Sequence, residues 1–206
     1  MDSIIFDLDG TLWDSIDTVL NAWNKVLKQS ELVEKELTSE DFRATMGLQM
    51  NEIGKRFFPD LDEVTRNKVI KDCGELENVV LEEQGGQLYQ NVEAVLEKLS
   101  NKYKLFIVSN CQDGYIEAFY KYHQLESFFI DYENPGKTGL SKGENIKLIM
   151  ERNNLASPVY VGDTLGDYNA AKEAGIPFVY AEYGFGDVED YDYIIHTLED
   201  LLTHFN

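Results

Sequence analysis

Cysteine and histidine are scarce in this 206-residue chain. The two cysteines, Cys73 and Cys111, form neither a disulfide framework nor a CxxC metal-binding pattern. We therefore expect free thiols and a reducing, cytoplasmic setting. The three histidines, His123, His196 and His204, are scattered along the sequence, which argues against a zinc site.

Positive charge is also in short supply. Lysine and arginine number 18 against 38 aspartate and glutamate residues, so the formal net charge is −20. Nucleic-acid binding needs a basic surface that displaces counterions, and anionic membranes attract basic segments. The charge therefore argues against both partners. It still allows a small anionic substrate, provided that a local cation and backbone amides hold it.

Long apolar runs are absent. No run approaches the ~18 apolar residues that a membrane-spanning helix needs. The first residues do not show a basic stretch followed by an apolar one, so we expect no secretory signal.

Short apolar runs are present, and they are typical of strands that are buried on both faces. Four are clear and a fifth is weaker: Ile4–Phe6, Leu105–Val108, Val159–Val161 and Ile176–Tyr180, then Phe128–Ile130. Helix-like stretches such as "NVEAVLEKLSN", "DGYIEAFYKYHQL", "SKGENIKLIMERNN" and "GDYNAAKEAG" lie between or beside the later runs. This alternation predicts an α/β fold with a doubly wound parallel sheet.

Residues 14–85 break that rhythm. "SIDTVLNAWNKVLKQS" has apolar residues at a helical period, and three further stretches up to "EVTRNKVIKDCGELENVVLEE" also read as helical without a strand. We therefore expect a helical domain over residues 14–85, inserted into a core domain made of residues 1–13 and 86–206. "EEQGGQ", residues 82–87, is the expected return linker.

Polar residues that could bind a ligand or take part in catalysis follow the expected strands. In an open parallel sheet, ligands bind beyond the carboxyl ends of the strands, so these residues should converge. Carboxylates crowded into such a crevice repel one another, and a hard cation that accepts oxygen ligands, such as Mg²⁺, would relieve the repulsion. The residues are Asp7, Asp9, Gly10, Thr11, Ser109, Asn110, Asp163 and Asp167, together with Lys142 at the start of an expected helix.

Four segments in this order, "DLDGT", "VSN", "SKGENI" and "VGDTLGD", resemble the signature motifs of the haloacid dehalogenase-like hydrolases. The helical insert after "DLDGTLWDS" resembles the type I cap of the phosphoglycolate phosphatase-like branch, as does "AAKEAGIPFVYAEYGFG". The resemblance covers essentially the whole chain. It implies a Rossmann-like core, a helical cap, and hydrolysis of a small phosphorylated metabolite with Mg²⁺ as cofactor.

The resemblance also implies roles for individual residues. Asp7 would be the nucleophile that forms an aspartyl-phosphate, and Asp9 would protonate the leaving oxygen and then activate water. Gly10 would let the chain turn sharply after the strand. Mg²⁺ would be held by Asp7, the backbone carbonyl of Asp9, Asp163 and, directly or through water, Asp167.

The transferred phosphate needs contacts of its own. Ser109, the Asn110 amide, Gly10 and Thr11 are the expected phosphate-binding positions. Lys142 would neutralise charge on the nucleophile and the transferred group. Here the sequence departs from the usual pattern, because Gly143 rather than proline follows the lysine, and Lys137 is a competing candidate. We favour Lys142, since its helix leads to the strand before Asp163.

Other functions share parts of this pattern. A phosphomutase of the β-phosphoglucomutase type has the same nucleophile and acid–base residue, although "GDTLGD" favours a phosphatase. A non-enzymatic phospho-aspartate switch would not need Asp9 or a cap, and a dehalogenase would not need an acid at Asp9. Arg43, Lys55 and Arg56 are candidate anion contacts in the cap. The substrate and the choice between monomer and homodimer stay open.

Overall fold

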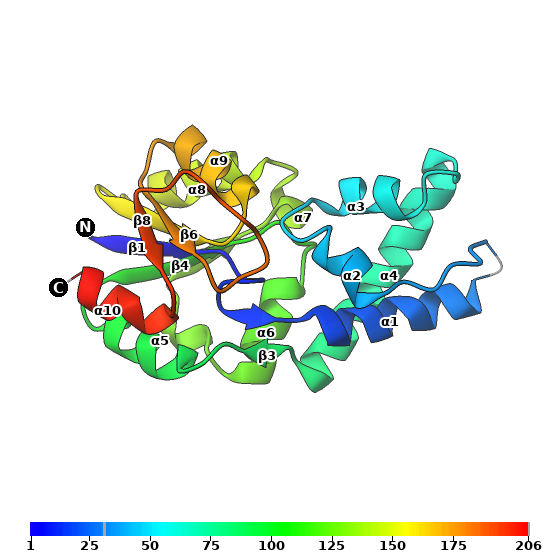
Figure 1. The fold of residues 1–206 in the computed structure, drawn as a ribbon, viewed down its shortest axis with the longest axis horizontal. Coiled ribbons are helices and arrows are strands. Elements are labelled where there is room, and N and C mark those ends of the chain that lie inside the picture. Colours follow the sequence, from blue (N-terminus) through cyan, green and yellow to red (C-terminus); the bar gives the residue numbers. More distant parts are fainter. Residues whose placement is uncertain (31, 206) are drawn as a thin grey trace.

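The computed structural model describes residues 1–30 and 32–205 and is built around a six-stranded sheet. All neighbouring strands pair in parallel, which confirms the expected α/β fold. Figure 1 shows the sheet and its helices at one end and helices α1–α4 at the other. The strand order is β5 (Asp131–Glu133), β4 (Lys104–Val108), β1 (Ser3–Phe6), β6 (Pro158–Gly162), β7 (Phe178–Ala181) and β8 (Tyr193–Ile195).

Helices cover both faces of the sheet, because alternate strand residues point in opposite directions. Ile4 and Phe6 join a cluster with helices α5 (Val92–Ser100) and α6 (Tyr115–His123). Ile5 joins a second cluster on the other face, with buried residues of α8 and α9. Those helices span Lys142–Arg152 and Leu165–Ala174. The sheet is thus doubly wound, with β1 at the point where the strand order reverses.

The edge strands differ from the expectation. Phe128–Ile130 is not a strand: Glu126–Phe128 form a short 3₁₀ helix, and β5 begins only at Asp131. The apolar run at residues 128–130 led to a wrong strand prediction. An edge strand is covered less fully than a central one, so its residues need not be apolar. Its acidic residues are instead paired with Arg152 of α8, at 2.8 Å to Asp131 and 2.7 Å to Glu133. The other edge strand, β8, was not predicted.

The helices of residues 16–84 pack on one another. They are α1 (Ile16–Gln29), α2 (Ser39–Arg43), α3 (Met50–Phe57) and α4 (Glu63–Gln84). The rings of Trp23, Phe42 and Phe57 meet edge to face at centroid distances of 5.2–5.9 Å. Although α4 has 22 residues, no helix in the described part of the chain is long and apolar enough to cross a membrane.

A two-stranded antiparallel ribbon joins this helical part to the sheet. Strand β2 (Trp13–Asp14) pairs with β3 (Gln87–Leu88), so both connections run side by side. Two expectations need correction here: Asp14 lies in a strand, and α4 runs to Gln84, which reduces the return linker to two glycines. A side chain on the second, Gly86, would meet Trp13 and Asp14 within 3.0 Å.

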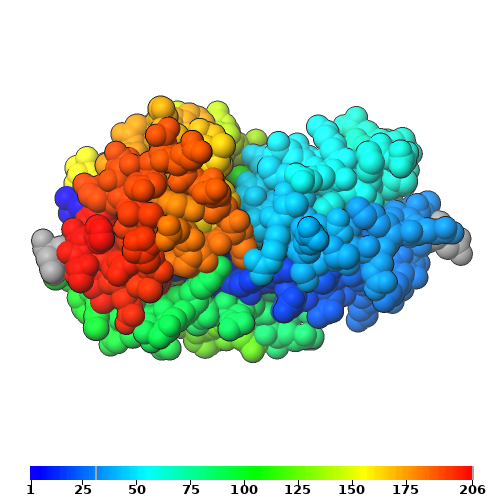
Figure 2. Space-filling model, in the orientation of Figure 1, coloured from blue at the N-terminus to red at the C-terminus, as the bar shows by residue number. Residues whose placement is uncertain are grey.

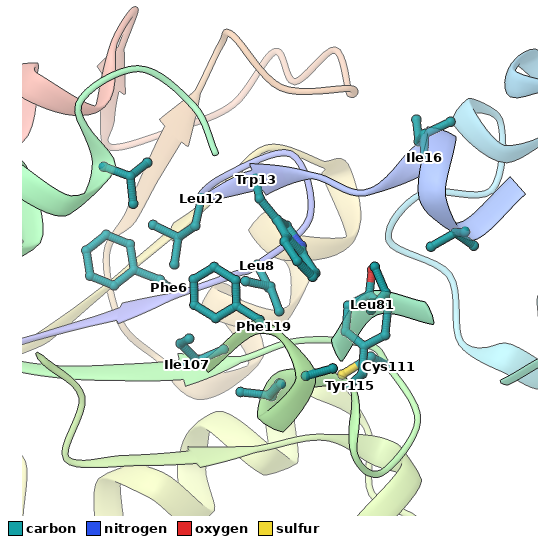
Figure 3. Packing of buried hydrophobic residues seen from close by; sticks show 14 of the residues in the cluster. Phe6, Leu8, Leu12, Trp13, Ile16, Leu81, Ile107, Cys111, Tyr115 and Phe119 are labelled. Carbon is teal, nitrogen blue, oxygen red and sulfur yellow. The ribbon is translucent and has the colours of Figure 1, made fainter. Parts of the chain in front are cut away.

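The loop after β1 is anchored by aromatic packing. Figure 3 shows Trp13 facing Tyr115 and Phe119 of α6, whose ring centroids lie 5.7 and 5.0 Å from that of Trp13. Leu8 and Leu12 of the same loop are fully buried. The chain leaving β1 is therefore held in place on both sides of Asp9.

Candidate active site

The carboxyl ends of β1 and β6 bring two acids together. Asp7 directly follows β1 and Asp163 directly follows β6, and the two strands pair in register, Phe6 with Val161. The Asp7 amide extends this pairing by donating to the Val161 carbonyl at 2.8 Å. Both carboxylates are buried, at 2% and 0% exposure. The parallel register of β1 and β6 is therefore enough to bring the two carboxylates close together.

Asp167 completes an acidic cluster. One carboxylate oxygen each from Asp7, Asp163 and Asp167 lies within 4.8 Å of the other two. Asp167 is fixed by the first turn of α9: its Oδ2 accepts from the Thr164 amide at 2.9 Å and from the Thr164 hydroxyl at 2.7 Å. In return, the Thr164 hydroxyl accepts from the Asp167 amide at 3.3 Å. This capping box holds the third carboxylate toward the other two.

Lys142 is the cation at this cluster. Its Nζ lies 2.9 Å from Oδ1 of Asp7 and 2.6 Å from Oδ1 of Asp167, and the side chain is 5% exposed. Ser141 caps the helix that begins with it, in a second capping box with Glu144. The competing candidate, Lys137, is exposed and lies with its Nζ 5.2 Å from the Tyr132 ring centroid.

Burial and like charge act on the acids in the same direction. Burial, followed by the charge of Asp167, raises the pKa of Asp7 to about 7 although Lys142 opposes the shift. Burial and the charges of Asp167 and Asp7 also raise the pKa of Asp163 well above its ordinary value. Burial lowers the pKa of Lys142, but the charges of Asp167 and Asp7 outweigh this and raise it. More positive charge would stabilise this site.

The donor set fits a hard divalent cation. Oδ2 of Asp163 accepts from the Phe185 amide at 2.7 Å, whereas its Oδ1 is buried without a hydrogen-bond partner among the described residues. An unpartnered buried carboxylate oxygen is costly unless a cation meets it. Asp7, Asp163 and Asp167 offer only oxygen ligands, which suits Mg²⁺ or Ca²⁺ rather than zinc.

Asp9 lines the same cavity as Asp7 and is held by two hydroxyls. Its Oδ1 accepts from Ser15 Oγ at 2.6 Å and from Tyr115 OH at 2.8 Å. Burial raises the pKa of Asp9, and these hydrogen bonds from Ser15 and Tyr115 offset part of the rise. A raised pKa favours the protonated form, so a carboxyl group that faces the cavity in this way is suited to donate a proton there.

Gly10 and Thr11 are placed in the turn and not at the cavity. The Gly10 amide donates to the Trp13 carbonyl at 2.9 Å, and the Thr11 amide donates to Leu8 at 3.3 Å. Neither residue lines the cavity that Asp7 and Asp9 share. These bonds leave neither amide available to a phosphate, so we remove both residues from the expected phosphate contacts.

Gly10 is required for a steric reason. Its φ is +79°, and a Cβ there would lie 2.1 Å from Oδ2 of Asp163. We expect Gly10→Ala to lower the free energy of unfolding by about 2 kcal/mol or more, from left-handed strain plus the clash. Gly139→Ala is the matched control, because Gly139 has φ +72° and nothing within 4 Å of its Cβ. It should cost only the strain, about 1 kcal/mol. If urea unfolding shows that both variants lose the same free energy of unfolding, the clash at Gly10 is contradicted.

The cavity lies between the sheet and the helices α1–α4. Its volume is about 60 Å³, which leaves room for the polar end of a small molecule or for a few waters. Ser109, which is 3% exposed, and Asn110 line it from the end of β4. Asn110 also bridges to the helical part, because its Nδ2 donates to the Gly47 carbonyl at 2.8 Å. In Figure 2 this helical part abuts the end of the molecule that holds the sheet.

The expected anion contacts of the helical part lie elsewhere. Arg43, Lys55 and Arg56 are exposed, and none of them lines the cavity. Arg43 instead pairs with Asp14 at 3.6 Å and lies 5.4 Å from the Phe185 ring centroid. Sequence reasoning selected these residues by charge alone, and charge does not report which face of a helix meets the cavity.

Sequence reasoning missed Glu77 of α4, which lines the cavity and is 4% exposed. It accepts from Trp23 Nε1 and, at 3.0 Å, from Gln112 Nε2. Burial raises its pKa to about 7. A signal was available: Cys73, Glu77 and Leu81 follow one another at four-residue spacing on the buried stripe of α4. An acid on an otherwise apolar face of a helix is unusual, and it indicates a candidate functional position.

Comparisons with known proteins show which family this chain resembles. The family model for haloacid dehalogenase-like hydrolases matches residues 4–181. A phosphoglycolate phosphatase from Synechococcus elongatus is 28% identical over 98% of this chain and 96% of its own length. Another, from Aliivibrio fischeri, is 26% identical over 90% of this chain and 86% of its own. A haloacid dehalogenase-like hydrolase from Streptococcus pneumoniae shares the fold, with a TM-score of 0.85, 24% identity and coverage of 100% and 99%.

The match spans the strand ends that carry Asp7, Ser109 and Asp163 as well as Lys142. Together with the curated relatives, it confirms the resemblance noted in the sequence and the assignment as a hydrolase. This chain belongs to the haloacid dehalogenase-like hydrolase family and is similar to its phosphoglycolate phosphatases.

Proposed function

We propose that the protein is a Mg²⁺-dependent phosphatase that hydrolyses a small phosphate monoester through an aspartyl-phosphate on Asp7. The observation that carries this proposal is the buried cluster in which Lys142 lies 2.9 Å from Asp7 beside Asp163 and Asp167. Asp9 lines the same cavity as Asp7. A nucleophile, an acid and a charge-balancing lysine therefore share one site.

In the first step, a carboxylate oxygen of Asp7 attacks phosphorus, and the bond between phosphorus and the leaving oxygen breaks. Asp9 gives its proton to that oxygen, so the product leaves as an alcohol. Ser109 and the Asn110 amide hold the non-bridging oxygens of the phosphate. Lys142 offsets the negative charge that Asp7 and the phosphate bring together.

In the second step, Asp9 removes a proton from water, and the water oxygen attacks phosphorus. The bond to the Asp7 oxygen then breaks and inorganic phosphate is released. The Ser15 and Tyr115 hydroxyls keep the Asp9 carboxylate in place through both steps, since both donate to its Oδ1. Asp9 returns to its protonated state, ready for the next cycle.

Asp7, Asp163 and the backbone carbonyl of Asp9 are the proposed Mg²⁺ ligands. Asp167 supports the site directly or through water, because its Oδ1 already meets Lys142 and its Oδ2 meets Thr164. Bound Mg²⁺ supplies Lewis-acid charge that shields the attacking carboxylate from the phosphate.

Residues 14–85 are the proposed cap domain, over the core of residues 1–13 and 86–206. Their helices supply Val19, Trp23, Met50 and Glu77 to the cavity, so the cavity is closed only when both parts meet. Such closure excludes water during the first transfer. Cys73 and Cys111 are free thiols, which supports a cytoplasmic setting.

Hydrolysis is favoured over a phosphomutase reaction by the relatives. Both curated relatives named above are phosphoglycolate phosphatases, and a third is described as a pyrophosphatase from Clostridium perfringens, 26% identical over 84% of this chain. Each name describes removal of phosphate to water. A small phosphorylated metabolite is the proposed partner.

Activity should depend on Mg²⁺. We expect turnover of p-nitrophenyl phosphate to be lost in EDTA and restored by Mg²⁺, with Ca²⁺ a poor substitute. Ca²⁺ prefers more ligands at about 2.3–2.6 Å, against about 2.0–2.1 Å for Mg²⁺. Mg²⁺ should also raise the melting temperature of the wild type, and not that of Asp163→Asn, because binding stabilises the folded state. Full activity in metal-free buffer would contradict the proposal.

A further inference from the structure

Glu77 is a buried carboxylate that the proposed mechanism does not use. Both of its oxygens accept hydrogen bonds from neutral donors, Trp23 Nε1 and Gln112 Nε2. Among the described residues, no lysine, arginine or histidine forms an ion pair with it within 4.0 Å. Its negative charge therefore faces the cavity without a compensating cation.

The remainder of the cavity wall offers no cation either. Lys142 is the only positively charged residue among the described lining residues, and it is already engaged by Asp7 and Asp167. The walls from the helical part are mostly apolar: Val19, Trp23, Phe42, Met46, Leu48, Met50 and Ile53. A second anionic group on a substrate would find no free charge partner among these lining residues.

The chemistry fixes which way a substrate lies. Its phosphate must reach Asp7, next to Lys142 and Ser109, so the rest of the molecule occupies the space toward the helical part. That space is lined by Glu77, Gln112 and the apolar residues. A carboxylate at that end would lose water contacts beside a like charge, which disfavours its binding.

We propose that the substrate is a small phosphate monoester whose remaining part carries no negative charge, and that Glu77 is the specificity-determining residue that rejects a carboxylate there. This inference rests on the proposed phosphatase function and narrows it. It separates this chain from its named relatives, because 2-phosphoglycolate carries such a carboxylate. A hydroxyl group at that position would instead donate to Glu77.

The test compares two substrates of similar size, 2-hydroxyethyl phosphate and 2-phosphoglycolate, with the wild-type protein and Mg²⁺. The assay is run at pH 8, above the pKa of about 7 to which burial raises Glu77. We expect kcat/KM to favour 2-hydroxyethyl phosphate by about 100-fold, the effect of one like charge at close range in a partly buried site. Glu77→Gln keeps the shape and an acceptor oxygen but removes the charge, so it should reduce this preference at least about 10-fold.

Glu75→Gln is the matched control. Glu75 lies on the same helix but is exposed and pairs with Lys71, so the preference should stay at its wild-type value. If Glu77→Gln does not fold, Gln112→Lys places a cation beside Glu77 and should reduce the preference in the same direction. A purely structural role of Glu77 would lower both rates together and leave their ratio unchanged.

Two results overturn the inference. One is a wild-type preference for 2-phosphoglycolate. The other is a substrate ratio that stays the same in Glu77→Gln, or in Gln112→Lys where it is used. Turnover of p-nitrophenyl phosphate is measured alongside: if it is retained while either result occurs, only the inference fails. If no phosphate ester is hydrolysed, the proposed function fails and the inference falls with it.

Discussion

Asp7→Asn abolishes turnover while the protein stays folded: this is the largest effect that we expect from a single substitution. Asparagine is nearly isosteric with aspartate but is a poor nucleophile, so no covalent intermediate can form. Removing the nucleophile of an enzyme of this kind lowers kcat by roughly 10⁴-fold or more. The measurement is kcat for p-nitrophenyl phosphate in saturating Mg²⁺.

The fold of Asp7→Asn should be intact for a reason visible at the site. Burial and the charge of Asp167 raise the pKa of Asp7, so its ionised form is not what stabilises the folded chain. The circular dichroism spectrum should match that of the wild type, and the melting temperature should be no lower. Asp60→Asn, at an exposed position in the helical part, is the control and should keep full activity. More than a few per cent of wild-type activity in Asp7→Asn would refute Asp7 as the nucleophile.

Lys142→Ala should reduce kcat/KM by roughly 10²- to 10³-fold, the value of one preorganised donor to a transferring oxyanion. The reason is its position between Asp7 and Asp167, where burial protects its charge from screening by water. The side chain is only 5% exposed. Substrate hydrolysis across a range of concentrations gives the measurement.

Lys137→Ala is the matched comparison. This lysine is exposed and its Nζ contacts the Tyr132 ring, so its removal should change kcat/KM by less than a factor of about two, as expected of a solvent-screened charge. The two variants change the same side chain at positions five residues apart. If Lys137→Ala proves to be the damaging change, the site lysine has been misassigned. The assignment of the acids at the strand ends does not depend on this result.

The sequence predicted the central sheet well and its edges poorly, for a physical reason. Strands β1, β4 and β6 are covered on both faces, so their residues are almost all apolar. Such apolar runs are easily recognised in a sequence. Strand β5 is an edge strand whose acids bind Arg152, and no apolar run marks it. The short ribbon of β2 and β3 has only two residues per strand, too few for any periodicity.

Two acids of the site, Asp7 and Asp163, were predictable because each one directly follows a strand. Parallel register alone brings Asp7 and Asp163 together, and a capping box aims Asp167 at them. The wall made by the helical part was not predictable in the same way. Glu77 reaches the cavity only because α4 packs against α1 and α6 with a particular face inward. That orientation depends on long-range packing, which local sequence patterns do not encode.

The central claim, a covalent phosphoryl group on Asp7, can be measured directly in Asp9→Asn. With p-nitrophenyl phosphate the leaving group departs without a proton from Asp9, so the first step proceeds, whereas the second lacks its base. After mixing with Mg²⁺ and quenching in acid, intact-protein mass spectrometry should show the added mass of one phosphoryl group. Peptide mapping should place that group on the segment that contains Asp7. Product release with an unchanged protein mass, or a phosphoryl group on another residue, would contradict the account.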